Sequence, residues 1–302
     1  MKEFWRMLRL LLLWGVIYYG TIFVGAIVVI VGNPNISKEE YIEKLFDSPE
    51  FTVTALLGAL LIIAIFFGKR YVTLSPGLIE RKSARKFLGI LALATISYFF
   101  IDGSIMDLPF YHNLFPEEDW QKYEDMKFDF FSLLNLSFAG PVTEEIAFRG
   151  ILLGGLLRMR CRPWLAILIS ALAFGAVHGD GLKMLGCTGF GILCGWFFWR
   201  TRSLLPSIVA HIINNCFCAI AIVSEKIFGS SEEYEPTPTI DVILILVSVP
   251  ILYYSLRYLN RLIPRSPPPR WWNPLTKPHP NPRKNKKQER GICEKQMPLS
   301  RV

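Results

Sequence analysis

The most chemically unusual part of this sequence is segment 141–150, PVTEEIAFRG, which places three ionisable side chains inside the apolar run 130–157. A charge inside a membrane span costs roughly 2.5–3.5 kcal/mol on insertion scales unless it faces a partner or a wet cavity. Glu145 and Arg149 are four residues apart, so they share a helix face in the order that favours an ion pair. Glu144 points about 100° away because a helix turns once per 3.6 residues. Glu144 is therefore a spare carboxylate and a candidate general base.

Two later apolar segments also carry polar side chains at helical spacing. Phe174 and His178 are four residues apart, and so are His211 and Asn215. Each pair therefore shares a helix face. Taken singly, each has an ordinary explanation, because a membrane His or Asn often bonds a neighbouring helix and an acid–arginine pair can be purely structural. Together they exceed what packing requires and favour a functional site in one shared cavity.

The elements that must position these side chains are membrane helices. The 302 residues are 52% apolar, with several long uncharged runs. We expect an all-α, polytopic membrane protein with about eight transmembrane helices around an intramembrane polar cavity. Gly140 and Pro141, just before the acidic pair, can kink the fourth span and admit water. The expected spans are about 10–31, 51–68, 87–106, 130–157, 163–178, 184–200, 204–224 and 239–259.

The net charge of +8 belongs to the C-terminal tail. Residues 261–302 hold eleven Lys or Arg and two Glu, a balance of +9, which leaves about −1 for the rest. The tail has too little apolar surface to fold, so we expect disorder and contact with anionic lipid rather than with nucleic acid. The loops alternate between basic and acidic, which by the positive-inside rule puts both termini in the cytoplasm. The plasma membrane of a prokaryote is the default location.

Three motifs, in order, resemble those of the CPBP intramembrane proteases. This family comprises CAAX proteases and bacteriocin-processing enzymes, also called Abi proteins, and the prenyl-protein endopeptidase Rce1 is its best-known member. Any one motif is weak, whereas the ordered set within eight spans is specific. The motifs are Glu144-Glu145-x-x-x-Arg149, Phe174-x-x-x-His178 and His211-x-x-x-Asn215.

The resemblance divides the chain into four parts. We expect N-terminal transmembrane helices and loops over residues 1–127 and a CPBP-like catalytic core over residues 128–224. The last transmembrane helix would occupy residues 225–260, and the basic, Pro-rich cytoplasmic tail residues 261–302. The tail lies outside the family pattern.

The resemblance also implies an activity, the hydrolysis of a peptide bond in a membrane-associated protein or peptide, by CAAX-type or peptide-precursor processing. Glu144 with His178 would activate the attacking water. His211 and Asn215 would donate hydrogen bonds to the tetrahedral oxyanion. Glu145 with Arg149 would hold the helix and tune the site, and Phe174 would wall the pocket.

Metal use and protease activity both have alternatives. Glu144, His178 and His211 could form a three-ligand zinc site with an open position, and the family has often been described as metalloproteases. The HExxH spacing of common zinc proteases is absent, so we favour a glutamate-dependent mechanism without a cofactor. A non-proteolytic membrane immunity or scaffold protein that keeps the motif for helix packing is the second interpretation. A transporter with a proton site at Glu144 would need repeats or paired broken helices, which the sequence lacks.

Overall fold

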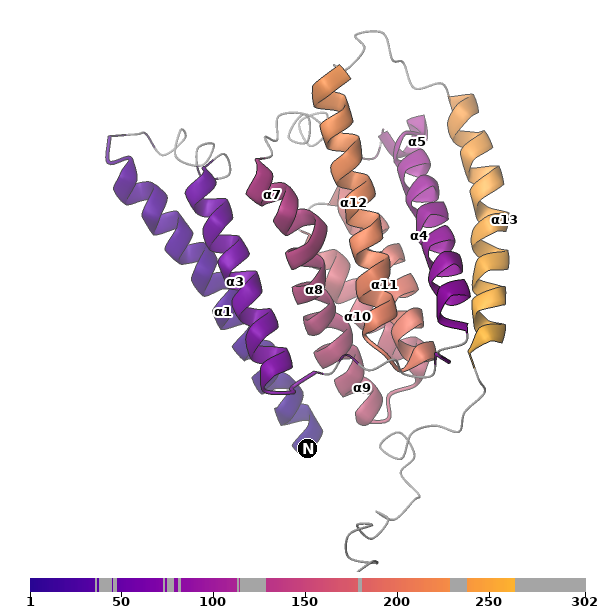
Figure 1. Ribbon diagram of the computed structural model, residues 1–302, viewed down its shortest axis with the longest axis horizontal. Helices are drawn as coiled ribbons and strands as arrows, with labels where there is room; N and C mark the ends of the chain where they lie inside the picture. Colours follow the sequence, from indigo (N-terminus) through magenta and orange to yellow (C-terminus); the bar gives the residue numbers. More distant parts are fainter. Residues whose placement is uncertain are drawn as a thin grey trace, which may run out of the picture. The chain divides into compact units, whose positions relative to one another are not determined.

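The computed structural model describes residues 1–35, 48–72, 83–112, 129–178, 181–228 and 238–263, with isolated positions 37, 45, 74, 79, 80 and 114. Every regular element in these ranges is a helix, and the helices pack side by side (Figure 1). The chain divides into two units, residues 1–265 and 266–302, and all described residues belong to the first. The expectations for the basic tail fall almost entirely outside the described residues.

The all-α prediction is confirmed, and each expected span falls almost entirely on helical residues. Five helices in the described ranges are long and apolar enough to cross a membrane, namely α1, α3, α4, α12 and α13. The count of eight spans therefore stays a prediction. The helices outside the fourth expected span are α1 (Lys2–Gly32), α3 (Pro49–Gly68), α4 (Ala84–Met106), α5 (Pro109–His112), α10 (Pro163–Ala176), α11 (Gly181–Thr201), α12 (Leu205–Phe228) and α13 (Pro238–Leu262).

The fourth expected span is helical throughout but changes its hydrogen-bond register twice. Its parts are α7 (Phe130–Leu134), the π-helical η2 (Asn135–Ala139), α8 (Gly140–Glu145), the π-helical η3 (Ile146–Leu153) and α9 (Gly154–Arg158). Where the sequence predicts a kink, the Gly140 N–H bonds to the Asn135 carbonyl five residues back. The wider π-helical turn accommodates Pro141, which has no N–H to donate. Such π segments occur frequently at functional sites.

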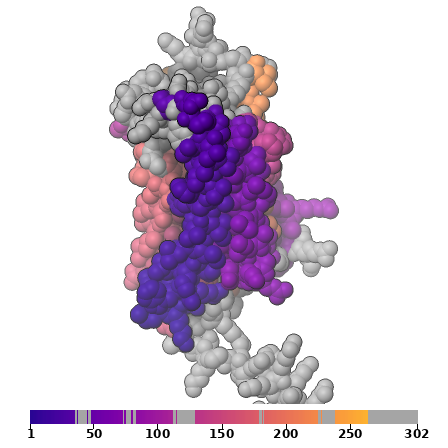
Figure 2. Space-filling model, turned by 90° about the vertical axis from the view of Figure 1, so that its left-hand side faces the viewer, coloured from indigo at the N-terminus to yellow at the C-terminus, as the bar shows by residue number. Residues whose placement is uncertain are grey.

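Helix α1 packs against α3 through two reciprocal close approaches. A Cβ at Gly25 would collide with the Thr54 hydroxyl, and a Cβ at Gly58 would collide with the Thr21 side chain. Small residues at such points let helix backbones approach closely in membranes. Figure 2 shows α1 beside α3 on this face of the molecule. The exposed side of α1 carries apolar residues at helical spacing and fits contact with lipid; these residues are Leu12, Val16, Tyr19 and Phe23.

Helix α12 is the element that brings the expected polar motifs together. It contacts α4 and α11, and it also contacts η2 and α8 of the fourth span. Helices α10 and α11 form one extensively packed pair, and α4 and α13 form another. The His211 motif on α12 therefore faces the Glu144 motif, with α10 and α11 alongside.

Candidate active site

The first feature of the site is a fully buried ion pair. Arg149 Nη1 lies 2.7 Å from Glu145 Oε1, and both side chains are 0% exposed. Arg149 Nη2 donates to the Gly191 carbonyl of α11 at 3.2 Å, and the guanidinium lies 4.5 Å from the centroid of the Phe174 ring on α10. A guanidinium is attracted to an aromatic face at this distance. Arg149 thus joins the fourth span to both α10 and α11.

His211 lies between the two neighbouring acids. Its Nδ1 is 3.0 Å from Glu145 Oε1, and its Nε2 is 3.6 Å from Glu144 Oε2. The carboxylate paired with Arg149 can only accept, so His211 Nδ1 carries the proton in this contact. This bond fixes the ring with Nε2 directed toward Glu144. The sequence predicts the pairing of Glu145 with Arg149 and misses its second contact, with His211.

Glu144 differs from Glu145 in exposure and in partners. The Glu144 side chain is 24% exposed, whereas that of Glu145 is fully buried. The 3.6 Å separation from His211 Nε2 exceeds an ordinary hydrogen bond, which spans about 2.7–3.2 Å. Glu144 therefore keeps carboxylate oxygen available to water or to a bound peptide. This geometry supports the expectation that Glu144 is the spare acid.

His178 joins the group through Phe174. Its Nδ1 lies 2.7 Å from the Phe174 carbonyl, which can only accept, so Nδ1 is the protonated nitrogen and Nε2 carries the lone pair of the neutral ring. The buried Phe174 ring contacts His178 at 4.6 Å and His211 at 5.5 Å between centroids. We call this group the Glu-His cluster; its members are Glu144, Glu145, Arg149, Phe174, His178 and His211.

Asn215 lies one helical turn beyond His211 and bonds to the fourth span. Its Nδ2 donates to the Leu136 carbonyl at 2.9 Å, and its Oδ1 accepts from Asn214 Nδ2 at 3.3 Å. In the π register the Leu136 carbonyl would accept from residue 141, but Pro141 has no N–H. The proline therefore leaves this carbonyl open to Asn215. One amide hydrogen of Asn215 holds α12 against η2, which leaves the second for the donor role that the family resemblance implies.

Trp14 is a contributor that the motifs do not reveal. Its indole N–H donates to the Thr143 carbonyl at 3.1 Å, immediately before Glu144, and its ring lies against Phe148 at 6.4 Å. Buried tryptophans usually find such a partner for their N–H. The sequence gives no signal for this contact, because Trp14 lies near the start of the expected span 10–31 and tryptophan is common close to membrane interfaces.

The cluster does not assemble into a metal site. Among the described residues, no three His, Cys, Asp or Glu side chains lie close enough together to hold a metal ion. The alternative zinc ligands Glu144, His178 and His211 are all described, yet they do not form such a group. The donor set in this arrangement therefore does not fit the three-ligand zinc centre that the sequence leaves as an alternative.

The comparisons with known proteins fall on this same part of the chain. Residues 126–217 match the family model described as Type II CAAX prenyl endopeptidase Rce1-like. Over these residues the chain is similar to that family, whose motifs the sequence also resembles. The matched segment holds all six members of the Glu-His cluster together with Asn215. The chain is an integral, multi-pass membrane protein, as the family and its apolar helices indicate.

A Bacillus subtilis (strain 168) protein named "Putative membrane peptidase YdiL" is 37% identical over 84 residues. The alignment covers 28% of this chain and 34% of that relative, so the similarity concerns about a third of the relative's length. No solved structure matches this chain. Helices α1, α3, α4 and α13 lie outside the Rce1-like segment, so Trp14 reaches the cluster from outside it.

Proposed function

We propose that this protein is an intramembrane endopeptidase that hydrolyses a peptide bond in a membrane-associated protein or peptide. The observation that carries the proposal is that two adjacent acids differ in burial and in their partners. Glu145 is fully buried and bonded to Arg149 and His211, whereas Glu144 is partly exposed and approaches only His211 Nε2, at the longer distance of 3.6 Å. A reactive carboxylate held by a rigid charged scaffold is what water activation requires.

In the proposed mechanism, Glu144 and His178 activate the attacking water. Glu144 accepts the proton of the water through a carboxylate oxygen, and Nε2 of His178 is the free ring nitrogen that can share or pass on that proton. The water oxygen then bonds to the substrate carbonyl carbon. The proton is afterwards delivered to the departing amine, so that the C–N bond breaks and the Glu144 carboxylate is regenerated.

The oxyanion of the tetrahedral intermediate would be stabilised by His211 and Asn215. His211 already gives its Nδ1 hydrogen to Glu145, so it can donate from Nε2 only as the doubly protonated cation. Carboxylates on both sides of the ring balance that charge electrostatically. Asn215 would add its second amide hydrogen. Preorganised donors of this kind typically contribute about 10²–10³ in rate.

The family description and the relative's name both support a substrate at the membrane. The description names a CAAX prenyl endopeptidase, and the relative is named as a membrane peptidase. We take the substrate class to be a membrane-associated protein or a peptide precursor cleaved close to the bilayer. Prenylated CAAX proteins and unprenylated precursors both belong to this class.

Comparison of membrane proteomes tests the proposal directly. Cells carrying Glu144→Gln should accumulate at least one uncleaved precursor that wild-type cells process, with the variant inserted in equal amounts. Glu50→Gln, an exposed acid in the first turn of α3, is the matched control and should leave processing unchanged. Identical precursor patterns in wild-type and Glu144→Gln cells would instead favour a non-proteolytic immunity or scaffold protein.

We further propose that the reaction needs no metal, because the cluster does not provide a three-ligand set. Dialysis of the purified protein against a strong zinc chelator should leave the rate of precursor cleavage within about twofold. Loss of cleavage that one equivalent of zinc restores would contradict this part of the proposal and favour metal activation of water.

A further inference from the structure

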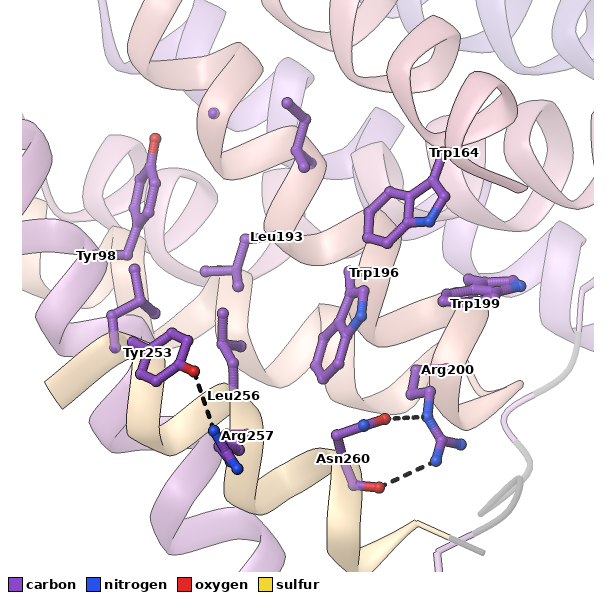
Figure 3. Close-up of a pocket in the computed structure, with 13 residues that line it drawn as sticks. Tyr98, Trp164, Leu193, Trp196, Trp199, Arg200, Tyr253, Leu256, Arg257 and Asn260 are labelled. Carbon is purple, nitrogen blue, oxygen red and sulfur yellow. Dashed lines mark hydrogen bonds between the residues drawn. The ribbon is translucent and has the colours of Figure 1, made fainter. Parts of the chain in front are cut away.

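A cavity lies away from the Glu-His cluster, between α4, α10, α11 and α13 (Figure 3). It encloses about 720 Å³, within the size range of small-ligand sites. Along α11 it runs from Gly189 to Arg200, roughly 16 Å at 1.5 Å per residue. None of its lining residues belongs to the cluster. We call it the aromatic groove.

The walls of the groove are apolar and aromatic along most of its length. Leu193 and Trp196 of α11 face Leu252 and Leu256 of α13 across it. Trp164 and Trp199 add a ring pair at 5.7 Å on one side, as Figure 3 shows. Tryptophan is enriched at the membrane–water interface because its ring is amphipathic. The groove therefore combines a hydrocarbon-like wall with an interfacial rim.

Its rim carries positive charge. The described lining residues include Arg200 and Arg257 and no Asp or Glu. Arg257 donates to the neutral Tyr253 hydroxyl at 3.1 Å, which leaves its charge uncompensated by that bond (Figure 3). Arg200 donates to the Asn260 side chain at 2.6 Å and to the Asn260 and Ile263 carbonyls at 3.0 Å. Arg200 thereby fixes the end of α13 and the width of the groove.

We propose that the aromatic groove binds an anionic phospholipid of the predicted cytoplasmic leaflet. One acyl chain lies along Leu193, Leu252 and Leu256, and the phosphate contacts Arg257, with Arg200 adding to the positive field. Basic pockets between transmembrane helices at the cytoplasmic side bind anionic headgroups in this way. A single groove with apolar walls and a cationic end matches the two chemistries of a phospholipid.

Thermal unfolding of the full-length protein in detergent tests this binding. Dioleoylphosphatidylglycerol should raise the unfolding midpoint at concentrations where dioleoylphosphatidylcholine, with the same chains, has little effect. Inorganic phosphate should have none. Arg257→Gln should weaken the apparent affinity for the anionic lipid about tenfold, as expected for loss of one charge-assisted hydrogen bond. Ile192→Trp, which fills the groove from α11, should weaken it at least as much.

Arg261→Gln is the matched control, because Arg261 lies one turn after Arg257 and lines a neighbouring cavity rather than the groove. It should keep the wild-type response. The proposal is overturned if both lipids stabilise equally, if inorganic phosphate alone reproduces the effect, or if Arg257→Gln retains full affinity. An equal loss in Arg261→Gln would also overturn it, since that result indicates nonspecific attraction to basic residues.

Discussion

Helix α11 presents one face to the Glu-His cluster and another to the aromatic groove. The two regions differ in how deeply their charged side chains are buried and in the partners of those side chains. In the cluster, Arg149 and Glu145 are fully buried and pair with each other, with the Gly191 carbonyl and with His211. In the groove, Arg257 lies at an exposed rim with a neutral partner. Buried charges persist only when neighbours pair with them. The cluster should therefore be rigid and sensitive to substitution, and the groove tolerant.

Removal of the buried cation should produce the largest effect. Arg149→Met leaves Glu145 buried without its partner, and breaking such a pair costs about 3–5 kcal/mol. We expect a correspondingly lower free energy of unfolding in detergent and little inserted protein in cells. The double variant Glu145→Gln/Arg149→Met should recover part of the loss. A stability within about 1 kcal/mol of wild type for Arg149→Met would show that the pair does not hold the cluster.

Loss of the His211 donor should affect rate more than fold. His211→Gln retains a donor toward Glu145 but cannot carry the imidazolium charge, so kcat should fall about 100-fold with KM nearly unchanged. Steady-state kinetics on the precursor provides the measurement. Phe190→Leu is the matched control, because Phe190 contacts the same ring at 5.2 Å without a hydrogen bond. A similar kcat loss in both variants would indicate that His211 contributes through packing and not as a hydrogen-bond donor.

The smallest effect should come from α1, outside the Rce1-like segment. Trp14→Phe keeps the aromatic contact with Phe148 and removes the indole bond to the Thr143 carbonyl. One such bond is worth about 1 kcal/mol, so we expect about a fivefold lower kcat. Trp5→Phe, at a 52% exposed position of the same helix, should match wild type. An unchanged kcat in Trp14→Phe would indicate that α1 contacts lipid without supporting the cluster.

Much of the cluster was predictable because its residue types are rare within membrane-spanning segments. Charged and polar side chains interrupt apolar runs at helical spacing, and this signal led to Glu144, Glu145, Arg149 and His211. The structure brings these four together, with His178 joined through the Phe174 ring. The roles of the individual residues stay predictions.

The remainder depends on tertiary contacts that spacing does not encode. The π register of η2 opens the Leu136 carbonyl to Asn215, and a helical wheel with 3.6 residues per turn does not contain that shift. Trp14 was missed because it lies near the start of the uncharged run in α1, where a tryptophan is ordinary. The aromatic groove was missed because Trp196, Leu256 and their neighbours are ordinary residues for membrane helices.

The central claim is that the two adjacent acids have different roles. Glu145 stabilises the structure, and Glu144 activates the attacking water. The most direct test measures precursor cleavage and the free energy of unfolding together for purified Glu144→Gln. We predict a rate about 10²–10⁴ lower with stability within about 1 kcal/mol of wild type, because Gln keeps the shape but cannot accept a proton. Cleavage within a few fold of wild type would contradict the account.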